Sequence, residues 1–214
     1  MSDSQLDAPA TSAELSACRA IHLLTASGIV VGMLAIIAVL DGAPRAAVLL
    51  LVLAQVIDGI DGPLARRFDI KNLMPKYDGY ILDLVIDYVT CVLVPAVFAW
   101  HFVVLPHGPG GEIAIAVMLT DDHWFRGFPA VWNLVIPTLW LLDTPGTLAV
   151  IIVLVLSALS MTDVEFAHTV QAPQWRKPNM AFMAIWVASL TGLTIAWPTT
   201  NPLTDLVLLL GPAW

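Results

Sequence analysis

Long apolar runs, separated by short turn-rich breaks, fill the chain from residue 20 onward. A helix needs about 20 consecutive apolar residues to cross a bilayer. Apolar windows occur at 21–40, 46–65, 79–104, 129–142, 145–161 and 179–197, with a short one at 203–214. The breaks carry turn residues, as in DGAPR at 41–45 and WPTTNP at 197–202. The pattern therefore predicts an all-α integral membrane protein.

One further segment, 106–119, is rich in proline and glycine and has only a short apolar run. Its crossing decides the topology, because cytoplasmic connections of membrane proteins are enriched in Lys and Arg. Four basic residues lie between the second and third windows, which places that connection in the cytoplasm: Arg66, Arg67, Lys71 and Lys76. If 106–119 also crosses, eight of the nine basic residues lie inside. We therefore predict a bundle of about eight transmembrane helices with both termini in the cytoplasm.

Composition agrees with a membrane setting. The chain of 214 residues is 58% hydrophobic and 12% charged, whereas soluble domains are about 25% charged. We expect a polar N-terminal segment at 1–19 and a single transmembrane domain at 20–214. The net charge of −8 argues against a nucleic-acid partner and leaves membrane lipids as the expected surroundings.

Four aspartates interrupt the second and third apolar windows at helical spacings. Asp58 and Asp61 are three residues apart, and Asp83 and Asp87 are four apart. Each pair therefore shares one face of a helix. At a rise of ~1.5 Å per residue, Asp61 and Asp83 both lie about 6–8 Å from the cytoplasmic ends of their helices. An antiparallel helix pair would bring all four carboxylates together.

Carboxylates inside a membrane are costly and usually mark a functional site. Because they repel one another, a cluster of four needs a neutralising partner. All-oxygen ligands suit hard cations such as Mg²⁺, Mn²⁺ or Ca²⁺. Proton binding in an ion-coupled transporter is another solution, whereas helix capping by a single Asp does not explain four acids at one depth. The acids alone thus leave a metal-dependent enzyme and a transporter open.

The acid pairs belong to a longer pattern, Asp58-x-x-Asp61-Gly62-x-x-Ala65-Arg66 followed by Gly79-x-x-x-Asp83-x-x-x-Asp87. This pattern is similar to the signature of the CDP-alcohol phosphotransferases at all nine of its fixed positions. The twelve residues at 67–78 form a longer spacer than most of that family has, and they resemble the bacterial phosphatidylcholine synthases. The stretches HLLTASG at 22–28, TDDHWFRGFPAVWN at 120–133 and FAH at 166–168 resemble the same subgroup. The likeness covers about residues 20–200.

The resemblance implies the CDP-alcohol phosphotransferase fold and an enzyme that transfers the phosphatidyl group of CDP-diacylglycerol to choline with release of CMP. It implies that a pair of Mn²⁺ or Mg²⁺ ions is held by Asp58, Asp61, Asp83 and Asp87, and that Asp87 is also the general base. A homodimer in the bacterial inner membrane is expected, with the active site near the cytoplasmic face. Serine, inositol or glycerol phosphate as the acceptor is the alternative within the family.

The resemblance also assigns a nucleotide and diphosphate site, made of Asp58, Gly62, Ala65, Arg66 and Gly79. Small residues let the nucleotide approach the helices closely, and an arginine pairs with phosphate oxygens. Choline carries a fixed positive charge, which aromatic faces and carboxylates recognise. We predict its pocket among Asp121, Asp122, Trp124, Phe125, Trp132 and Tyr88. The alternative for these aromatic residues is plain anchoring at the membrane interface.

Overall fold

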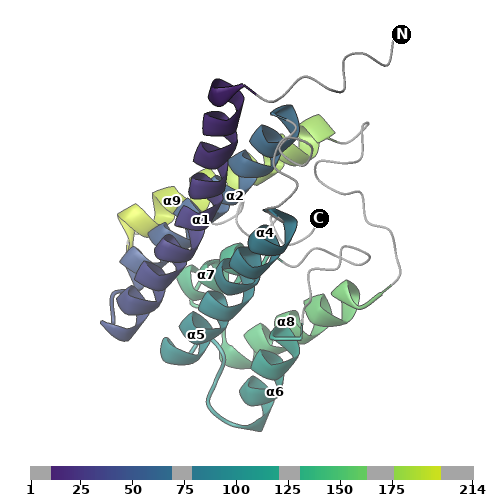
Figure 1. The fold of residues 1–214 in the computed structure, drawn as a ribbon. Coiled ribbons are helices and arrows are strands. Elements are labelled where there is room, and N and C mark those ends of the chain that lie inside the picture. Colours follow the sequence, from purple (N-terminus) through teal and green to yellow (C-terminus); the bar gives the residue numbers. More distant parts are fainter. Residues whose placement is uncertain (1–10, 69–78, 121–130, 163–175, 199–214) are drawn as a thin grey trace.

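The computed structural model describes residues 11–68, 79–120, 131–162 and 176–198. Every regular element in these ranges is helical (Figure 1). The elements are α1 (Ser12–Leu40), α2 (Pro44–Arg67), α4 (Gly79–Asp87), η2 (Tyr88–Leu93), α5 (Val94–His101), α6 (Pro109–Met118), α7 (Trp132–Leu141), α8 (Gly146–Ser160) and α9 (Arg176–Ala196). The all-α prediction is confirmed.

Three stretches of helix are long and apolar enough to cross a membrane: Leu15–Leu40, Pro44–Arg67 and Ile81–His101. Shorter apolar helices occupy four further windows that the sequence predicts as spans. The segment 106–119, whose crossing decides the predicted topology, contains a helix of ten residues, Pro109–Met118. Such a helix is about 15 Å long, half of the roughly 30 Å hydrocarbon core. The predicted window 203–214 lies outside the described residues.

The first two helices form a hairpin, and the path from α4 through η2 to α5 packs along it (Figure 1). Gly42 closes the hairpin at a φ of +68°, a left-handed conformation that glycine adopts without strain. Pro44 then begins α2, where its missing N–H costs no helical hydrogen bond. At the same end of α2, Arg45 donates to the carbonyl of Thr194 over 3.1 Å and to that of Ile195, which ties α2 to the end of α9.

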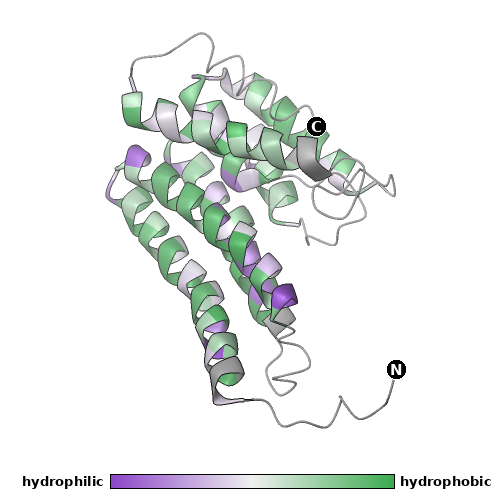
Figure 2. Ribbon diagram, turned by 90° about the horizontal axis from the view of Figure 1, so that it is seen from above, coloured by the Kyte–Doolittle hydropathy of each residue, from purple (hydrophilic) through white to green (hydrophobic). Residues whose placement is uncertain are grey.

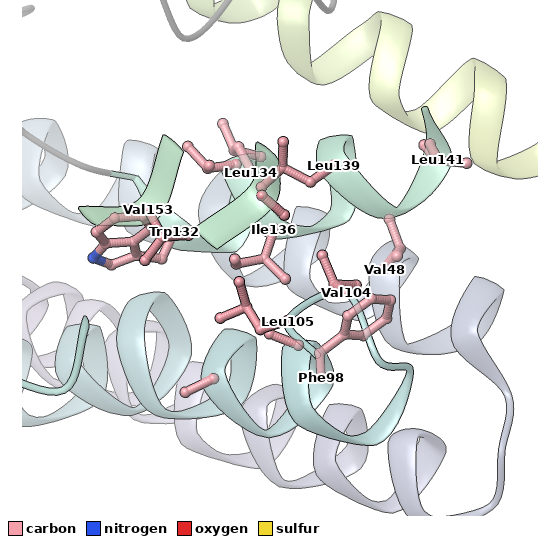
Figure 3. Packing of buried hydrophobic residues seen from close by; sticks show 14 of the residues in the cluster. Val48, Phe98, Val104, Leu105, Trp132, Leu134, Ile136, Leu139, Leu141 and Val153 are labelled. Carbon is pink, nitrogen blue, oxygen red and sulfur yellow. The ribbon is translucent and has the colours of Figure 1, made fainter. Parts of the chain in front are cut away.

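Helix α7 is the buried centre of the bundle. Nine of its ten residues are buried, and it packs against α2, η2, α5 and α9. Figure 3 shows its apolar side chains meeting those of neighbouring segments, with Ile136 toward Leu105 and Phe98. Helix α7 is thus enclosed by other helices of the bundle on nearly all sides.

The outer faces of the helices are also apolar. Leu23, Val30 and Met33 of α1 are exposed, as are Ile151 and Val155 of α8. Figure 2 accordingly shows hydrophobic residues along most of the length of the helices. Contiguous exposed apolar surface of this kind is unfavourable in water and natural in hydrocarbon. The chain is therefore a membrane protein built as a helical bundle.

Candidate active site

The four predicted aspartates line one pocket, together with Thr25 and Gly28 of α1. Asp58 and Asp61 come from α2, and Asp83 and Asp87 from α4. Within the described residues, carboxylate oxygens of Asp58, Asp83 and Asp87 all lie within 4.8 Å of one another. The helical spacing read from the sequence thus corresponds to a real convergence of three carboxylates.

Asp61 lines the same pocket but lies outside that close group of three. Asp61 is only 4% exposed, and Thr25 of α1 lines the pocket with it, while the Thr25 hydroxyl donates to the carbonyl of Ile21 over 3.3 Å. Asp61 is therefore a buried acid beside the group of three. The resemblance, in contrast, names Asp61 as a direct metal ligand together with Asp58 and Asp83, and Asp87 as a shared ligand and general base.

The close group of three suits a hard divalent cation. Carboxylate oxygens are the ligands that Mg²⁺, Mn²⁺ and Ca²⁺ prefer. Each of the three side chains is partly buried, so water screens their mutual repulsion only in part. A cation between them would turn this repulsion into attraction. The structure thus contains a cluster of three acids that fits a metal ion.

Close contact between α1 and α4 depends on Gly28. A Cβ atom at this position would lie 2.8 Å from Cγ2 of Ile86, the residue before Asp87. Real Cβ atoms essentially never come so close to a neighbour. The missing side chain lets α4 lie against α1 at the level of the acids.

We expect Gly28→Ala to destabilise the protein. Overpacking costs about 1–3 kcal/mol, which exceeds the roughly 0.5–1 kcal/mol that Ala gains over Gly within a helix. The β-branched side chain of Ile86 has little freedom to move away. The thermal unfolding midpoint in detergent should fall, and Ile86→Ala in the same chain should restore part of it. Gly192→Ala in α9, where nothing lies within 4 Å, is the control and should not lower the midpoint.

The helix changes its winding immediately after Asp87. Residues Tyr88–Leu93 form a π-helix, η2, before α5 resumes the α-helical winding at Val94. Thr90 in this turn donates its hydroxyl to the carbonyl of Ile86 over 2.9 Å and also lines the acid pocket. Short π-helical turns inside α-helices are frequent at functional sites.

The residues predicted to approach the nucleotide lie at the same end of α2 and α4. The guanidinium of Arg66 folds back toward Gly62, since a Cβ on Gly62 would lie 3.5 Å from Arg66 Nη1. Ala65 packs with Leu64 against Cys18 and Ile21 of α1. Ala65 thus has a packing role in the helix hairpin, while Gly62 and Arg66 lie next to one another.

The predicted choline residues fall in different places. Asp121, Asp122, Trp124 and Phe125 lie outside the described residues. Tyr88 donates its hydroxyl to the carbonyl of Leu119 over 3.0 Å and is partly exposed. Trp132 is fully buried in the main hydrophobic cluster (Figure 3). Of the six, Tyr88 alone is described, exposed and next in sequence to a pocket aspartate.

Sequence analysis missed two polar residues that the fold connects to the site. Gln55 on α2 donates to Asp58, and Asn133 on α7 donates to Gln55. A signal for Gln55 was present: it is a polar residue in an apolar window, three positions before Asp58 and thus on the same face. Asn133 ends the stretch TDDHWFRGFPAVWN, but nothing in the sequence connects it to Gln55.

The chain is similar to bacterial proteins named phosphatidylcholine synthase. It is 37% identical to that of Pseudomonas aeruginosa over 196 residues, which cover 86% of this chain and 82% of the relative. It is 36% identical to that of Agrobacterium fabrum over 185 residues, covering 78% and 75%. The corresponding protein of Rhizobium meliloti is 35% identical over 184 residues, covering 78% and 74%.

The chain belongs to the phosphatidylcholine synthase family. Likeness at this level over most of both chains cannot arise from apolar composition alone. Membership in the phosphatidylcholine synthase family confirms the resemblance found from the Asp motif and its long spacer. No protein-family model matches the chain, and no solved structure matches it.

Proposed function

We propose that this protein is a CDP-diacylglycerol–choline O-phosphatidyltransferase, which makes phosphatidylcholine and releases CMP. The observation that carries the proposal is the convergence of the motif carboxylates Asp58, Asp83 and Asp87 within 4.8 Å in a chain of the phosphatidylcholine synthase family. Pyrophosphate chemistry needs concentrated positive charge, and a pocket of acids provides the ligands for it. A transporter does not need the Gly and Arg positions of the motif.

The metal would be a pair of Mn²⁺ or Mg²⁺ ions, held by Asp58, Asp83 and Asp87, with Asp61 completing the set beside them. When bound, such ions neutralise the diphosphate and stabilise the departing phosphate. Asp58 would then lie close to the nucleotide as well as to the metal. Gly62 and Gly79 leave room for the nucleotide, and the Arg66 guanidinium pairs with its phosphate oxygens.

In the proposed reaction, Asp87 is the general base. Its carboxylate accepts the proton of the choline hydroxyl, and the choline oxygen forms a bond to the phosphatidyl phosphorus. The bond from that phosphorus to the bridging oxygen breaks, and CMP leaves with the bonding electrons. Asp87 lies one helical turn from Asp83, deeper in the bundle by about 6 Å, which suits an acceptor that lies beyond the diphosphate.

We further propose that the protein lies in the bacterial inner membrane with the acid pocket near the cytoplasmic face. The basic residues at the end of α2 and in its connection to α4 support this orientation, because Arg and Lys concentrate on the cytoplasmic side. CDP-diacylglycerol would reach the pocket laterally from the bilayer, and choline from the cytoplasm. A homodimer is the proposed assembly.

The decisive experiment is a CMP-release assay on the purified protein with CDP-diacylglycerol and one alcohol at a time. Choline should support release and yield phosphatidylcholine. Equal or better use of serine, inositol or glycerol phosphate would replace choline as the acceptor while keeping the reaction class. No CMP release with any alcohol would overturn the enzyme assignment and favour a transporter.

Trp124→Ala tests the choline pocket predicted from the sequence. A quaternary ammonium has no N–H to donate, so its recognition depends on charge and on aromatic faces. Loss of one cation–π contact of about 0.5–2 kcal/mol should raise the KM for choline by about 2- to 30-fold. The KM for CDP-diacylglycerol should stay unchanged. Steady-state kinetics with each substrate varied in turn checks this, and an equal loss for both substrates would show that Trp124 has a structural role.

A further inference from the structure

A chain of two side-chain hydrogen bonds runs from the buried centre of the bundle to the acid pocket. Nδ2 of Asn133, on α7, donates to Oε1 of Gln55, on α2, over 2.8 Å. Nε2 of Gln55 donates in turn to Oδ2 of Asp58 over 3.2 Å. Asn133 and Gln55 are 78 positions apart in the sequence, so only the packing of α7 on α2 brings them together.

The direction of this chain follows from the chemistry of its last member. An ionised carboxylate offers acceptors only, so Gln55 must present its NH₂ group to Asp58. The carbonyl of Gln55 then faces Asn133, which must donate. Turning either amide over would place two acceptors or two donors opposite each other. The arrangement therefore holds both amides in one orientation.

The effect on Asp58 is to fix one of the three close carboxylates. A carboxylate with two rotatable bonds keeps a single direction only when a neighbour holds it. The bond to Oδ2 restricts this rotation beside Asp83 and Asp87, with which Asp58 shares the candidate metal site. Mutation of a residue that hydrogen-bonds to a metal ligand typically lowers metal affinity or activity by about 10- to 100-fold.

The burial of Asn133 argues against a purely structural role. Its side chain is 0% exposed on a helix whose neighbouring residues Leu134 and Ile136 belong to the apolar cluster. Among the described residues its Oδ1 has no hydrogen-bond partner. An unsatisfied buried acceptor costs stability, which an apolar residue of the same size would not. A buried polar side chain that is not fully hydrogen-bonded in an apolar core is typical of a functional site.

We propose that Gln55 is a positioning residue for Asp58, and that Asn133 holds Gln55 in its donating orientation. Helix α7, which contributes no aspartate to the pocket, thereby sets the geometry of the metal site. The inference rests on the proposed function, because it takes the acid pocket to bind a divalent cation.

The test is Mn²⁺ binding to the full chain in detergent, measured by the EPR signal of free Mn²⁺. Gln55→Met keeps the size and removes the hydrogen bond, so it should weaken the Kd for Mn²⁺ by about 10- to 100-fold. Asn133→Leu should weaken it in the same direction. Since both changes break one chain, the double variant should bind no more weakly than Gln55→Met alone. The KM for choline should stay unchanged in all three.

Thr138→Val is the matched control, because Thr138 is buried on the same helix and accepts a hydrogen bond from Trp186 over 3.2 Å. It removes a buried hydrogen bond that does not lead to Asp58, and the Kd for Mn²⁺ should not change. Asn133→Leu keeps the proposal testable if Gln55→Met fails to fold. It removes an unsatisfied polar group from an apolar core, so the variant should stay folded.

Three results would overturn the proposal. An unchanged Kd in Gln55→Met would remove the positioning role while leaving the proposed reaction intact. Equal weakening by Thr138→Val would show that the effect comes from general packing of α7. Absence of Mn²⁺ binding by the wild type would reject the metal site itself, and the positioning role with it.

Discussion

Replacing Asp87 with Asn should lower kcat by about a hundredfold or more, the range expected when a general base is lost. Asn has nearly the same shape but cannot take the proton of the attacking hydroxyl. It keeps one oxygen that can bind a cation, so metal and nucleotide affinity should fall less than turnover. Asp58→Asn and Asp83→Asn remove charged ligands and should act mainly through weaker metal binding.

Steady-state kinetics at saturating Mn²⁺ and both substrates, combined with Mn²⁺ titrations of each variant, separates these roles. Asp41→Asn is a suitable control, because Asp41 is an exposed acid in the turn between α1 and α2. It should leave both kcat and the Kd for Mn²⁺ unchanged. Normal turnover of Asp87→Asn at saturating metal would mean that another group is the base.

Removal of divalent metal should abolish activity completely. Asp58, Asp83 and Asp87 place their oxygens within 4.8 Å of one another, and this negative pocket would repel a diphosphate. EDTA treatment followed by dialysis should stop CMP release, and Mn²⁺ or Mg²⁺ should restore it. Zn²⁺ should serve poorly, since it prefers nitrogen and sulfur ligands.

The thermal unfolding midpoint, measured beside activity, distinguishes loss of catalysis from loss of fold. The metal-free protein should stay folded and still show a cooperative unfolding transition, because the main apolar cluster around α7 is separate from the acid ligands. Full CMP release after exhaustive chelation would contradict the metal site. In that case the acids would need another source of neutralisation, such as protons.

The apolar windows and the acid spacing are features that the sequence by itself determined. Apolar stretches in lipid must form helices, since only a helix satisfies every backbone polar group within the segment. Seven of the eight predicted windows are helical among the described residues. Two Asp residues three or four positions apart must share a helix face, so the pairing of Asp58 with Asp61 and of Asp83 with Asp87 was also readable.

Other features were decided by the tertiary structure, because they depend on residues that are far apart in the chain. The close group of three acids, with Asp61 beside it, depends on how α4 lies against α1 at Gly28. The burial of Trp132 depends on the packing of α7 among four other helical elements. The link from Asn133 through Gln55 to Asp58 crosses 78 positions of sequence. Helical periodicity fixes neighbours within one helix, whereas contacts between helices depend on the shapes that pack together, and a linear pattern does not contain them.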